Sequence, residues 1–434
     1  MRAVDLIIRK RDGERLTRGE IDWFVDGLTA GRLPDYQASA LLMAIVFRGL
    51  DEEETGWLTD AMVRSGSRMD LSGLPGIKVG KHSTGGVGDK TSLVVVPLVA
   101  CCGAVAPKSS GRALGHTGGT IDKLESIPGF RTALSAREFE ESLRALGCAF
   151  TGQTAEVAPA DKTLYALRDV TGTIESVPLI ASSIMSKKIA EGTDALVLDV
   201  KVGGGAFMKD AGQARALAER MVAIGARVGL RTSAVLTRMD APLGRAVGNA
   251  LEVVECFETL KGRGPADLTE LCFVLAARMV YLAKRAASPE AARAMVEQAL
   301  SSGSALERLR QVIERQGGDA AVVDDYDRLP TAARREAVRA PRSGVVTGLD
   351  AARIGRVSMA LGAGRDRVEA VIDHGAGILL HVKPGDAVNA GDLLAELRVG
   401  GTARLDDARA VMAEAFTIAD AGTDPGPLVL DTVG

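Results

Sequence analysis

Apolar residues recur at helical spacing through the first 70 residues of the chain. The first clear stripe, which marks one face of a helix, consists of Ile21, Phe24, Val25 and Leu28. Thr17 and Glu20 stand before it at capping-box spacing, where each side chain satisfies a backbone N–H at the helix start. Similar patterns predict a helix over 36–48 and another over 51–64, which begins with acidic residues that suit a helix N-terminus. The stripe pattern therefore predicts a small all-helical domain over residues 1–70.

The pattern changes at about residue 77, where short apolar runs alternate with glycines. Residues 195–200 form a nearly continuous apolar run, which is typical of a strand buried on both faces. This run is followed by helical spacing over 214–228 and by a second apolar run over 233–239. The stretch therefore predicts a strand–helix–strand unit of a parallel sheet. Residues 93–99 fit either a strand, by propensity, or a helix capped by Asp89.

The C-terminal part of the chain has a third texture. Residues 329–344 combine prolines with a basic run (Arg334, Arg335, Arg339 and Arg342), and we interpret them as a solvated linker. Short alternating segments with Gly-Asp turns follow, and they predict a small β-rich domain.

Composition and charge exclude several classes of protein. The chain is 46% hydrophobic and 25% charged, which is typical of a folded globular protein. Its formal net charge is −3, so it lacks the basic excess of proteins that bind nucleic acid or anionic membranes. The longest apolar run, residues 93–106, is interrupted by Pro97 and Gly103 and is too short to span a bilayer. The cysteines lack metal-ligand spacing and are interpreted as reduced thiols, so we expect a cytoplasmic protein.

Two glycine-rich segments carry candidate anion-binding residues. The first is KHSTGGVGDKTS, residues 81–92, whose glycines let the backbone fold around an anion while Lys81 and the hydroxyls supply donors. It is not a Walker loop, because Asp89 separates Gly88 from Lys90, and it does not match the dinucleotide-binding pattern. A glycine-rich turn that binds nothing is the alternative.

The second segment is KSSGRALGHTGGTIDKLE, residues 108–125, in which Thr120 is a candidate N-cap of a short helix. Two such loops, each led by Lys or Ser, favour phosphate binding over turns alone. Further along the chain stand Arg168 and then Ser183 and Lys187, which are four residues apart and share a helix face. Solvated surface charges are the alternative interpretation of Arg168 and Lys187.

With these segments the chain resembles the pyrimidine-nucleoside phosphorylases and their relatives, the thymidine phosphorylases. The resemblance rests on KHSTGGVGDK, SGRALGHTGGTIDKLESIPGF, APADKTLYALRDVT and SSIMSKKIAEG, and it extends from Asp5 into the C-terminal domain. It implies a multi-domain α/β fold. The expected parts are a helical domain over 1–70 completed by helices at about 160–190, a large mixed α/β domain over 77–155 and 191–330, and a C-terminal α+β domain over 345–434.

The C-terminal domain has a resemblance of its own. Residues 381–394 look like the hammerhead fold of lipoyl- and biotin-carrying domains, but the carrier lysine in its Met-Lys-Met or Asp-Lys-Ala setting is missing. We therefore expect a structural or dimer-supporting role.

The family resemblance implies reversible phosphorolysis of pyrimidine nucleosides (uridine, thymidine, deoxyuridine) to the free base and α-D-(deoxy)ribose 1-phosphate, in pyrimidine salvage. It implies a phosphate site formed by Lys81, Ser83, Ser92, Lys108, Ser109, Ser110 and Thr120. It implies a base site formed by His82, Arg168, Ser183 and Lys187. The departing base gains negative charge, which Arg168 and Lys187 would stabilise, and His82 is a candidate general acid; these three are the expected catalytic residues.

Two positions bear on specificity and ion binding. Lys108 stands where the thymidine-restricted branch of the family typically has Met, so we expect both uridine and thymidine to be substrates. Relatives in the broad branch can bind a structural potassium ion through Gly88, a Thr at position 90, Leu243, Ala246 and Glu255. Here position 90 is Lys90. We expect its ammonium to replace the ion beside Glu255, and an ordinary exposed helix lysine is the alternative.

The resemblance implies no organic cofactor, inorganic phosphate as co-substrate, and a homodimer formed through the helical domain. Three alternatives stay open: a thymidine-restricted phosphorylase, a related phosphoribosyltransferase, and a non-catalytic nucleoside sensor. Dependence on magnesium and pyrophosphate would mark the transferase. The complete set of phosphate donors argues against the sensor.

Overall fold

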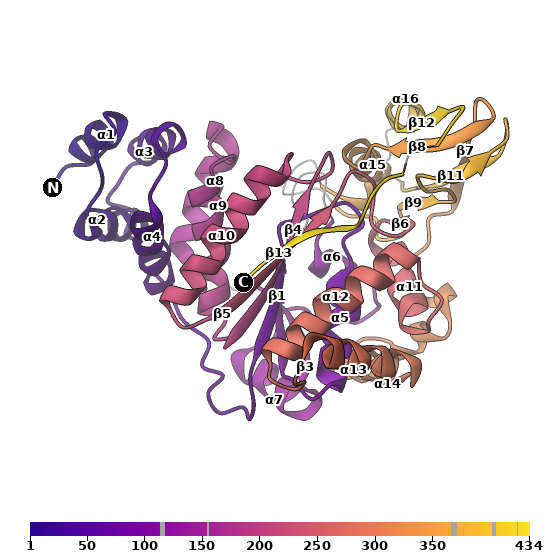
Figure 1. The fold of residues 1–434 in the computed structure, drawn as a ribbon, viewed down its shortest axis with the longest axis horizontal. Coiled ribbons are helices and arrows are strands. Elements are labelled where there is room, and N and C mark those ends of the chain that lie inside the picture. Colours follow the sequence, from indigo (N-terminus) through magenta and orange to yellow (C-terminus); the bar gives the residue numbers. More distant parts are fainter. Residues whose placement is uncertain (113–117, 154–155, 366–370, 402–404, 423) are drawn as a thin grey trace.

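The chain forms a helical region, a central sheet with helices on both faces, and a smaller β-rich region, as Figure 1 shows. The structure is a computed structural model that describes all residues except 113–117, 154–155, 366–370, 402–404 and 423. No helix among the described residues is long and apolar enough to cross a membrane.

The helical region joins the N-terminal helices to two helices from the middle of the chain. Its members are α1 (Ala3–Arg11), α2 (Arg18–Thr29), α3 (Asp35–Arg48), α4 (Glu52–Arg64), α8 (Pro159–Thr171) and α9 (Val177–Ala190). The capping box predicted from Thr17 and Glu20 is present at the start of α2. Ala160, Leu164 and Leu179 pack into the same apolar core as α1–α4. This packing places α8 and α9 between the N-terminal helices and the sheet (Figure 1).

The central sheet has the strand order β1–β4–β5–β13. Its strands β1 (Val79–Ser83), β4 (Ala195–Val202) and β5 (Arg231–Arg238) are parallel, and β13 (Val429–Val433) is antiparallel to β5. Strand β4 is buried along its whole length, as its apolar run predicts. Strands β4 and β5 with α10 (Ala211–Arg227) between them form the predicted strand–helix–strand unit. A second parallel pair, β2 (Ala106–Ser110) and β3 (Cys148–Gly152), lies beside β1.

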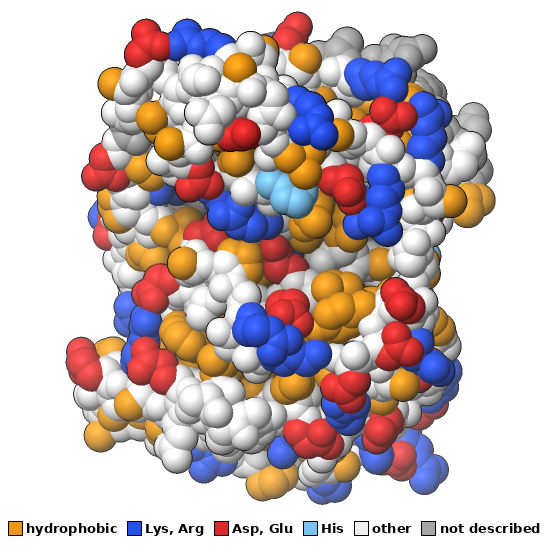
Figure 2. All heavy atoms as spheres, turned by 90° about the vertical axis from the view of Figure 1, so that its right-hand side faces the viewer, with side chains coloured by type: hydrophobic (Ala, Val, Ile, Leu, Met, Phe, Trp, Pro, Cys, Tyr) orange, Lys and Arg blue, Asp and Glu red, His pale blue; other side chains and the backbone are white. Residues whose placement is uncertain are grey.

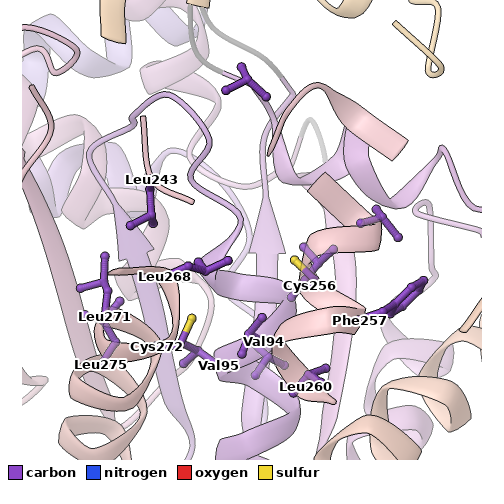
Figure 3. Close-up of a cluster of buried hydrophobic side chains, with 14 of the residues drawn as sticks. Val94, Val95, Leu243, Cys256, Phe257, Leu260, Leu268, Leu271, Cys272 and Leu275 are labelled. Atoms are coloured by element: carbon purple, nitrogen blue, oxygen red, sulfur yellow. The ribbon is translucent and has the colours of Figure 1, made fainter. Parts of the chain in front are cut away.

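Helix α10 packs against α9 on one face of the sheet, and α12 packs against β4 on the other. The remaining helices of this region are α5 (Thr91–Cys101), α6 (Thr120–Leu124), α7 (Ala136–Leu146), α11 (Asn249–Leu260), α12 (Ala266–Leu282), α13 (Pro289–Ser301) and α14 (Ser304–Arg315). Residues 93–99 are therefore helical, which decides between the two alternatives. Val94 and Val95 of α5 lie among apolar side chains of α11 and α12 in Figure 3, so all faces of this helix are covered.

The β-rich region contains two small antiparallel sheets with the orders β10–β8–β12 and β6–β9–β11–β7. Its strands are β6 (Ala246–Val247), β7 (Arg334–Arg339), β8 (Gly344–Leu349), β9 (Gly377–Leu380), β10 (Ala387–Val388), β11 (Leu393–Val399) and β12 (Phe416–Ala419). Its helices are α15 (Ala351–Ser358), a π-helical turn (Met359–Ala363) and α16 (Leu405–Ala413), and short 3₁₀ turns precede it at Ala320–Val323 and Tyr326–Arg328.

Two features of the β-rich region correct the interpretation of the sequence. The supposed linker contains the edge strand β7, which pairs with β11; its arginines face solvent, as charged residues of edge strands often do. The last strand, β13, leaves the β-rich region and joins β5 of the central sheet, so the expected boundary of a domain over 345–434 is crossed.

Figure 2 views the molecule from the right-hand side of Figure 1. Acidic and basic side chains are interspersed over the face that it shows, in line with the small net charge.

Candidate active site

A cavity of about 1050 Å³ lies between the helical region and the carboxyl ends of the parallel strands β1 and β2. Open α/β sheets bind ligands at this position. The cavity is lined by all the residues that the sequence pointed to: Lys81, His82, Ser83, Ser92, Lys108, Ser109, Ser110, Thr120, Arg168, Ser183 and Lys187. The first and last of these residues, Lys81 and Lys187, are 106 positions apart in the sequence, and the fold brings the whole set together. The volume suits a small-molecule ligand.

One wall of the cavity consists of the two glycine-rich segments. Strands β1 and β2 end at Ser83 and Ser110, and the loop after β1 turns into α5 through residues with positive φ, Gly85 (96°) and Gly88 (72°). Only glycine adopts this conformation without strain. Ser92 in the first turn of α5 lines the cavity, so the positive end of that helix borders it.

Two cap assignments from the sequence are wrong. The N-cap of α5 is Lys90 and not Asp89, whose carboxylate instead accepts a hydrogen bond from the Thr91 hydroxyl at 2.6 Å. Thr120 is the first residue of α6, and Gly119 is the N-cap. Helix α5 thus begins one residue later than expected, and α6 begins one residue earlier. Thr120 still borders the cavity. Residues 113–117 of the second segment lie outside the described residues.

Lys81 is buried within a network of charges beneath the first loop. Its Nζ donates to the Thr91 hydroxyl at 2.7 Å and lies 3.9 Å from Asp89 and 3.8 Å from Asp199. Asp199 is also paired with Lys201, at 2.7 Å. Burial opposes the charge of Asp89, but Lys81 and Lys201 hold the pKa of that carboxyl well below its usual range. The Thr91 hydroxyl and the two carboxylates therefore fix the Lys81 side chain at the cavity wall.

Lys108 and Ser110 stand at the end of β2. The Nζ of Lys108 donates to the backbone carbonyl of Lys81 at 2.9 Å, which ties the two loops together. Burial, and then the charges of Lys188 and Lys81, lower the pKa of Lys108 well below its usual value. The Ser110 hydroxyl is buried and has no hydrogen-bond partner among the described residues. A buried donor without a partner is costly unless a ligand satisfies it.

His82 lies where cationic side chains from both walls meet. Desolvation by the surrounding protein lowers its pKa well below the ordinary value, and the charges of Lys188, Lys108, Lys187 and Lys81 lower it further. At neutral pH the ring of the ligand-free protein is therefore uncharged. It can donate one N–H hydrogen bond but holds no extra proton to transfer.

The opposite wall belongs to α8 and α9. Arg168 is buried and donates to the backbone carbonyls of Thr173, Leu179 and Ile174 at 3.1, 3.2 and 2.6 Å. A guanidinium has five N–H groups, so some remain for the cavity that it lines. Lys187 donates to the Ser183 hydroxyl at 3.1 Å.

Three residues of this wall were missed by the sequence analysis. Asp161 accepts a hydrogen bond from Lys187 at 2.5 Å, and its second oxygen is buried without a partner among the described residues. The Tyr165 ring centre lies 5.9 Å from the cationic groups of both Arg168 and Lys187. Asp161, Tyr165 and Arg168 are spaced four and three residues apart, so they share one face of a helix. Since Arg168 was already a candidate, this spacing could have pointed to Asp161 and Tyr165. Lys188, paired with Glu191 at 2.5 Å, gave no such signal.

Lys90 does not line the cavity. It is buried, so the alternative of an ordinary exposed lysine is wrong. The described residues contain no group of three or more His, Cys, Asp or Glu side chains that could hold a metal ion.

Comparison with known proteins places this site in a family. Residues 4–66 match the helical bundle domain of a glycosyl transferase family, and residues 76–306 match its a/b domain. Residues 345–419 match the pyrimidine nucleoside phosphorylase C-terminal domain. The chain is 52% identical over 433 residues to the pyrimidine-nucleoside phosphorylase of Geobacillus stearothermophilus, covering 100% of both chains. It is 52% identical over 425 residues to that of Staphylococcus haemolyticus, covering 98% of each.

A solved structure shares the fold at much lower sequence identity. The anthranilate phosphoribosyltransferase of Thermus thermophilus superposes with a TM-score of 0.59 at 20% identity, over 72% of this chain and 99% of that one. This likeness concerns the fold alone.

Proposed function

Because the chain belongs to the pyrimidine-nucleoside phosphorylase family, we propose that it cleaves pyrimidine nucleosides with inorganic phosphate, reversibly, to the free base and α-D-(deoxy)ribose 1-phosphate. The observation that carries the proposal is a shared cavity in which cations and hydroxyls from two glycine-rich loops face cations from α8 and α9. Phosphate is the co-substrate, and the reaction needs no organic cofactor.

The first wall is proposed to bind phosphate. Its donors are Lys81, Ser83, Ser92, Lys108, Ser109, Ser110 and Thr120, with the N-terminus of α5 behind them. The anion would satisfy the unpartnered Ser110 hydroxyl and offset the crowding of Lys81 and Lys108. Phosphate already carries negative charge and needs no activating base, so fixed donors that orient it toward the anomeric carbon suffice.

The second wall is proposed to bind the base. Cleavage of the glycosidic bond moves negative charge onto the departing pyrimidine, and Arg168 and Lys187 at its carbonyl oxygens stabilise this charge in the transition state more than in the substrate. The Ser183 hydroxyl orients the ring, and His82 lies near the 2-carbonyl. Since the ring of His82 is neutral in the ligand-free protein, we propose that it acts there as an N–H donor or gains its proton only after phosphate has bound.

The sugar-side residue Lys108 is proposed to set substrate breadth. The N–H groups of a lysine side chain at this position offer a hydrogen bond to a ribose 2′-hydroxyl, whereas a thioether does not. We therefore expect uridine, deoxyuridine and thymidine all to be substrates. In the variant Lys108→Met we expect kcat/KM for uridine to fall relative to that for thymidine, and an unchanged ratio of the two would refute this role.

An exposed apolar surface supports a homodimer formed through the helical region. Tyr36 and Phe47 of α3 are 74% and 79% exposed, and Val4 and Ile8 are exposed on α1, which packs against α3. Large exposed apolar side chains on neighbouring helices are typical of protein interfaces. All five cysteines are unpaired, which supports the cytoplasm as the place of action.

The test is base release from uridine, thymidine and cytidine, measured by chromatography with and without phosphate. Phosphate-dependent release of uracil and thymine supports the proposal together with the broad specificity. Release of thymine alone keeps the reaction and refutes the breadth. Without release from any nucleoside the proposal fails, and activity that requires pyrophosphate and magnesium identifies a phosphoribosyltransferase instead.

A further inference from the structure

The side chain of Lys90 ends among oxygen atoms contributed by distant parts of the chain. Its Nζ donates to the carbonyls of Leu243 and Ala246 at 3.1 and 2.7 Å and to Oε2 of Glu255 at 2.5 Å. The carbonyl of Gly88 accepts the backbone N–H of Lys90 at 3.0 Å. Lys90 thus contacts oxygens of the four other residues that the family resemblance associates with potassium, three through its ammonium group and Gly88 through its backbone N–H.

Among the described residues, these contacts place a positive charge where a metal ion would have to sit. An ammonium group has three N–H donors, and here each has its own acceptor. The other oxygen of Glu255 accepts the backbone N–H groups of Arg245 and Ala246, at 2.8 and 3.2 Å. The neighbouring carboxylate, Glu252, lies 3.2 Å from Lys123 and so has a lysine of its own. A metal ion would add a second buried positive charge without a carboxylate to balance it, so the residues present do not fit one.

The ammonium remains charged in this pocket. Burial lowers its pKa, but the attraction of Glu255 and Glu252 outweighs burial and raises the pKa above the ordinary value for lysine. A permanent charge at the N-cap of α5 holds the end of the glycine-rich loop to α11 and to the segment 243–246. The same helix is also held by apolar packing: Figure 3 shows α5 among side chains of α11 and α12.

The backbone is shaped for this close contact. A side chain at Gly88 would meet the carbonyl of Leu243, since a Cβ built there lies only 2.6 Å from that oxygen. The loop therefore approaches segment 243–246 backbone to backbone, with the Lys90 ammonium as the link between the two.

We propose that Lys90 is a built-in cation: its ammonium group takes the place of a bound monovalent metal ion, and the protein therefore does not require potassium for its stability or its activity. The proposal concerns an ion requirement, and its main readout is thermal stability, so it is tested independently of the reaction.

The first experiment compares the unaltered protein in potassium chloride and in tetramethylammonium chloride at equal ionic strength. We expect the same Tm and the same turnover in both salts, and no stoichiometric potassium in elemental analysis after dialysis. A Tm that rises saturably with potassium, or one equivalent of retained potassium, overturns the proposal.

The second experiment uses variants that lack the Lys90 ammonium group. In Lys90→Thr the ammonium is removed and a hydroxyl is left, so we expect a lower Tm in tetramethylammonium chloride that potassium or ammonium ions restore in part. Lys90→Met is the matched control, because it fills the space without charge or ligand and should not respond to either ion. If Lys90→Thr folds but gains nothing from potassium beyond what Lys90→Met gains, the pocket is not a cation site and the proposal is wrong.

Discussion

The two ends of the first glycine-rich loop use a buried lysine in opposite ways. At the end that leads into α5, Lys90 donates to three oxygens within 3.1 Å and is sealed from the cavity. At the end that begins in β1, Lys81 has one close acceptor among the described residues, the Thr91 hydroxyl. Its two carboxylates stay 3.8 and 3.9 Å away, and its side chain borders the cavity. An ammonium whose donors are satisfied by the protein stabilises the fold, and one whose donors are left partly unused is available to a ligand.

The largest effect that tests this contrast is on stability. Replacing Lys90 by Met leaves Glu255 buried without its counter-charge, and breaking a buried ion pair in this way costs about 3–5 kcal/mol. We expect the free energy of unfolding, measured in denaturant, to fall by this order. Lys81→Met is the control and should lose less, because Asp199 keeps Lys201 at 2.7 Å. Equal losses in the two variants would remove the distinction between the two lysines.

The second effect is on activity. Lys81→Met removes a charged donor from the proposed phosphate site, and hydrogen bonds to charged groups contribute about 1.5–3 kcal/mol. We expect kcat/KM for phosphate to fall roughly 10- to 150-fold at saturating nucleoside. Lys90→Met, assayed well below its lowered Tm, should keep more of this activity than Lys81→Met. The reverse order would contradict the assignment of Lys81 to the cavity.

A smaller effect is expected at the base site, where Asp161 holds Lys187. In Asp161→Asn the ammonium loses its charged partner and becomes free to move, so we expect kcat for nucleoside to fall by about tenfold, which corresponds to about 1.4 kcal/mol. The KM for phosphate, bound on the other wall, should not change. Asp169→Asn is the matched control, since Asp169 lies on the same helix with an exposed carboxylate. Equal rates in both variants would show that Lys187 does not need Asp161.

Sequence patterns over short segments predicted the features of the fold that depend on neighbouring residues alone. The apolar stripes and the capping box of Thr17 and Glu20 predicted the N-terminal helices, and the apolar run of β4 predicted a buried strand. The glycine-rich segments pointed to Lys81 and Ser110, and both residues line the cavity; their binding of an anion stays a prediction.

What the sequence did not predict depends on contacts between distant segments. Residues 334–339 belong to a basic run that is typical of a solvated connection, and only their pairing with β11 makes them a strand. The partnership of Asp161 with Lys187 arises from the packing of α8 beside α9. Likewise, the family resemblance named the neighbours of Lys90, but only the fold brings its Nζ within hydrogen-bonding distance of Leu243, Ala246 and Glu255 at once.

The smallest change that we expect is in the proton equilibrium of His82. In the ligand-free protein its pKa is lowered by burial and by four lysines, so the protonated ring is disfavoured and stability is lost as pH falls from the ordinary histidine value toward that depressed pKa. A bound dianion offsets the lysine charges, so it should raise the pKa of His82. By linkage, the anion should then bind more tightly as pH falls through the pKa that His82 has in the anion-bound protein.

Sulfate is the appropriate probe, because unlike phosphate it does not titrate in this range. We expect the His82 ring resonances, assigned by their loss in His82→Asn, to titrate at higher pH with sulfate than without it. The pH dependence of sulfate affinity should also weaken in His82→Asn, and the part that remains should come from Lys108, whose pKa is lowered by the same crowding. A His82 titration that sulfate leaves unchanged would mean that the anion binds too far from the ring to charge it, and His82 would then act only as a neutral donor.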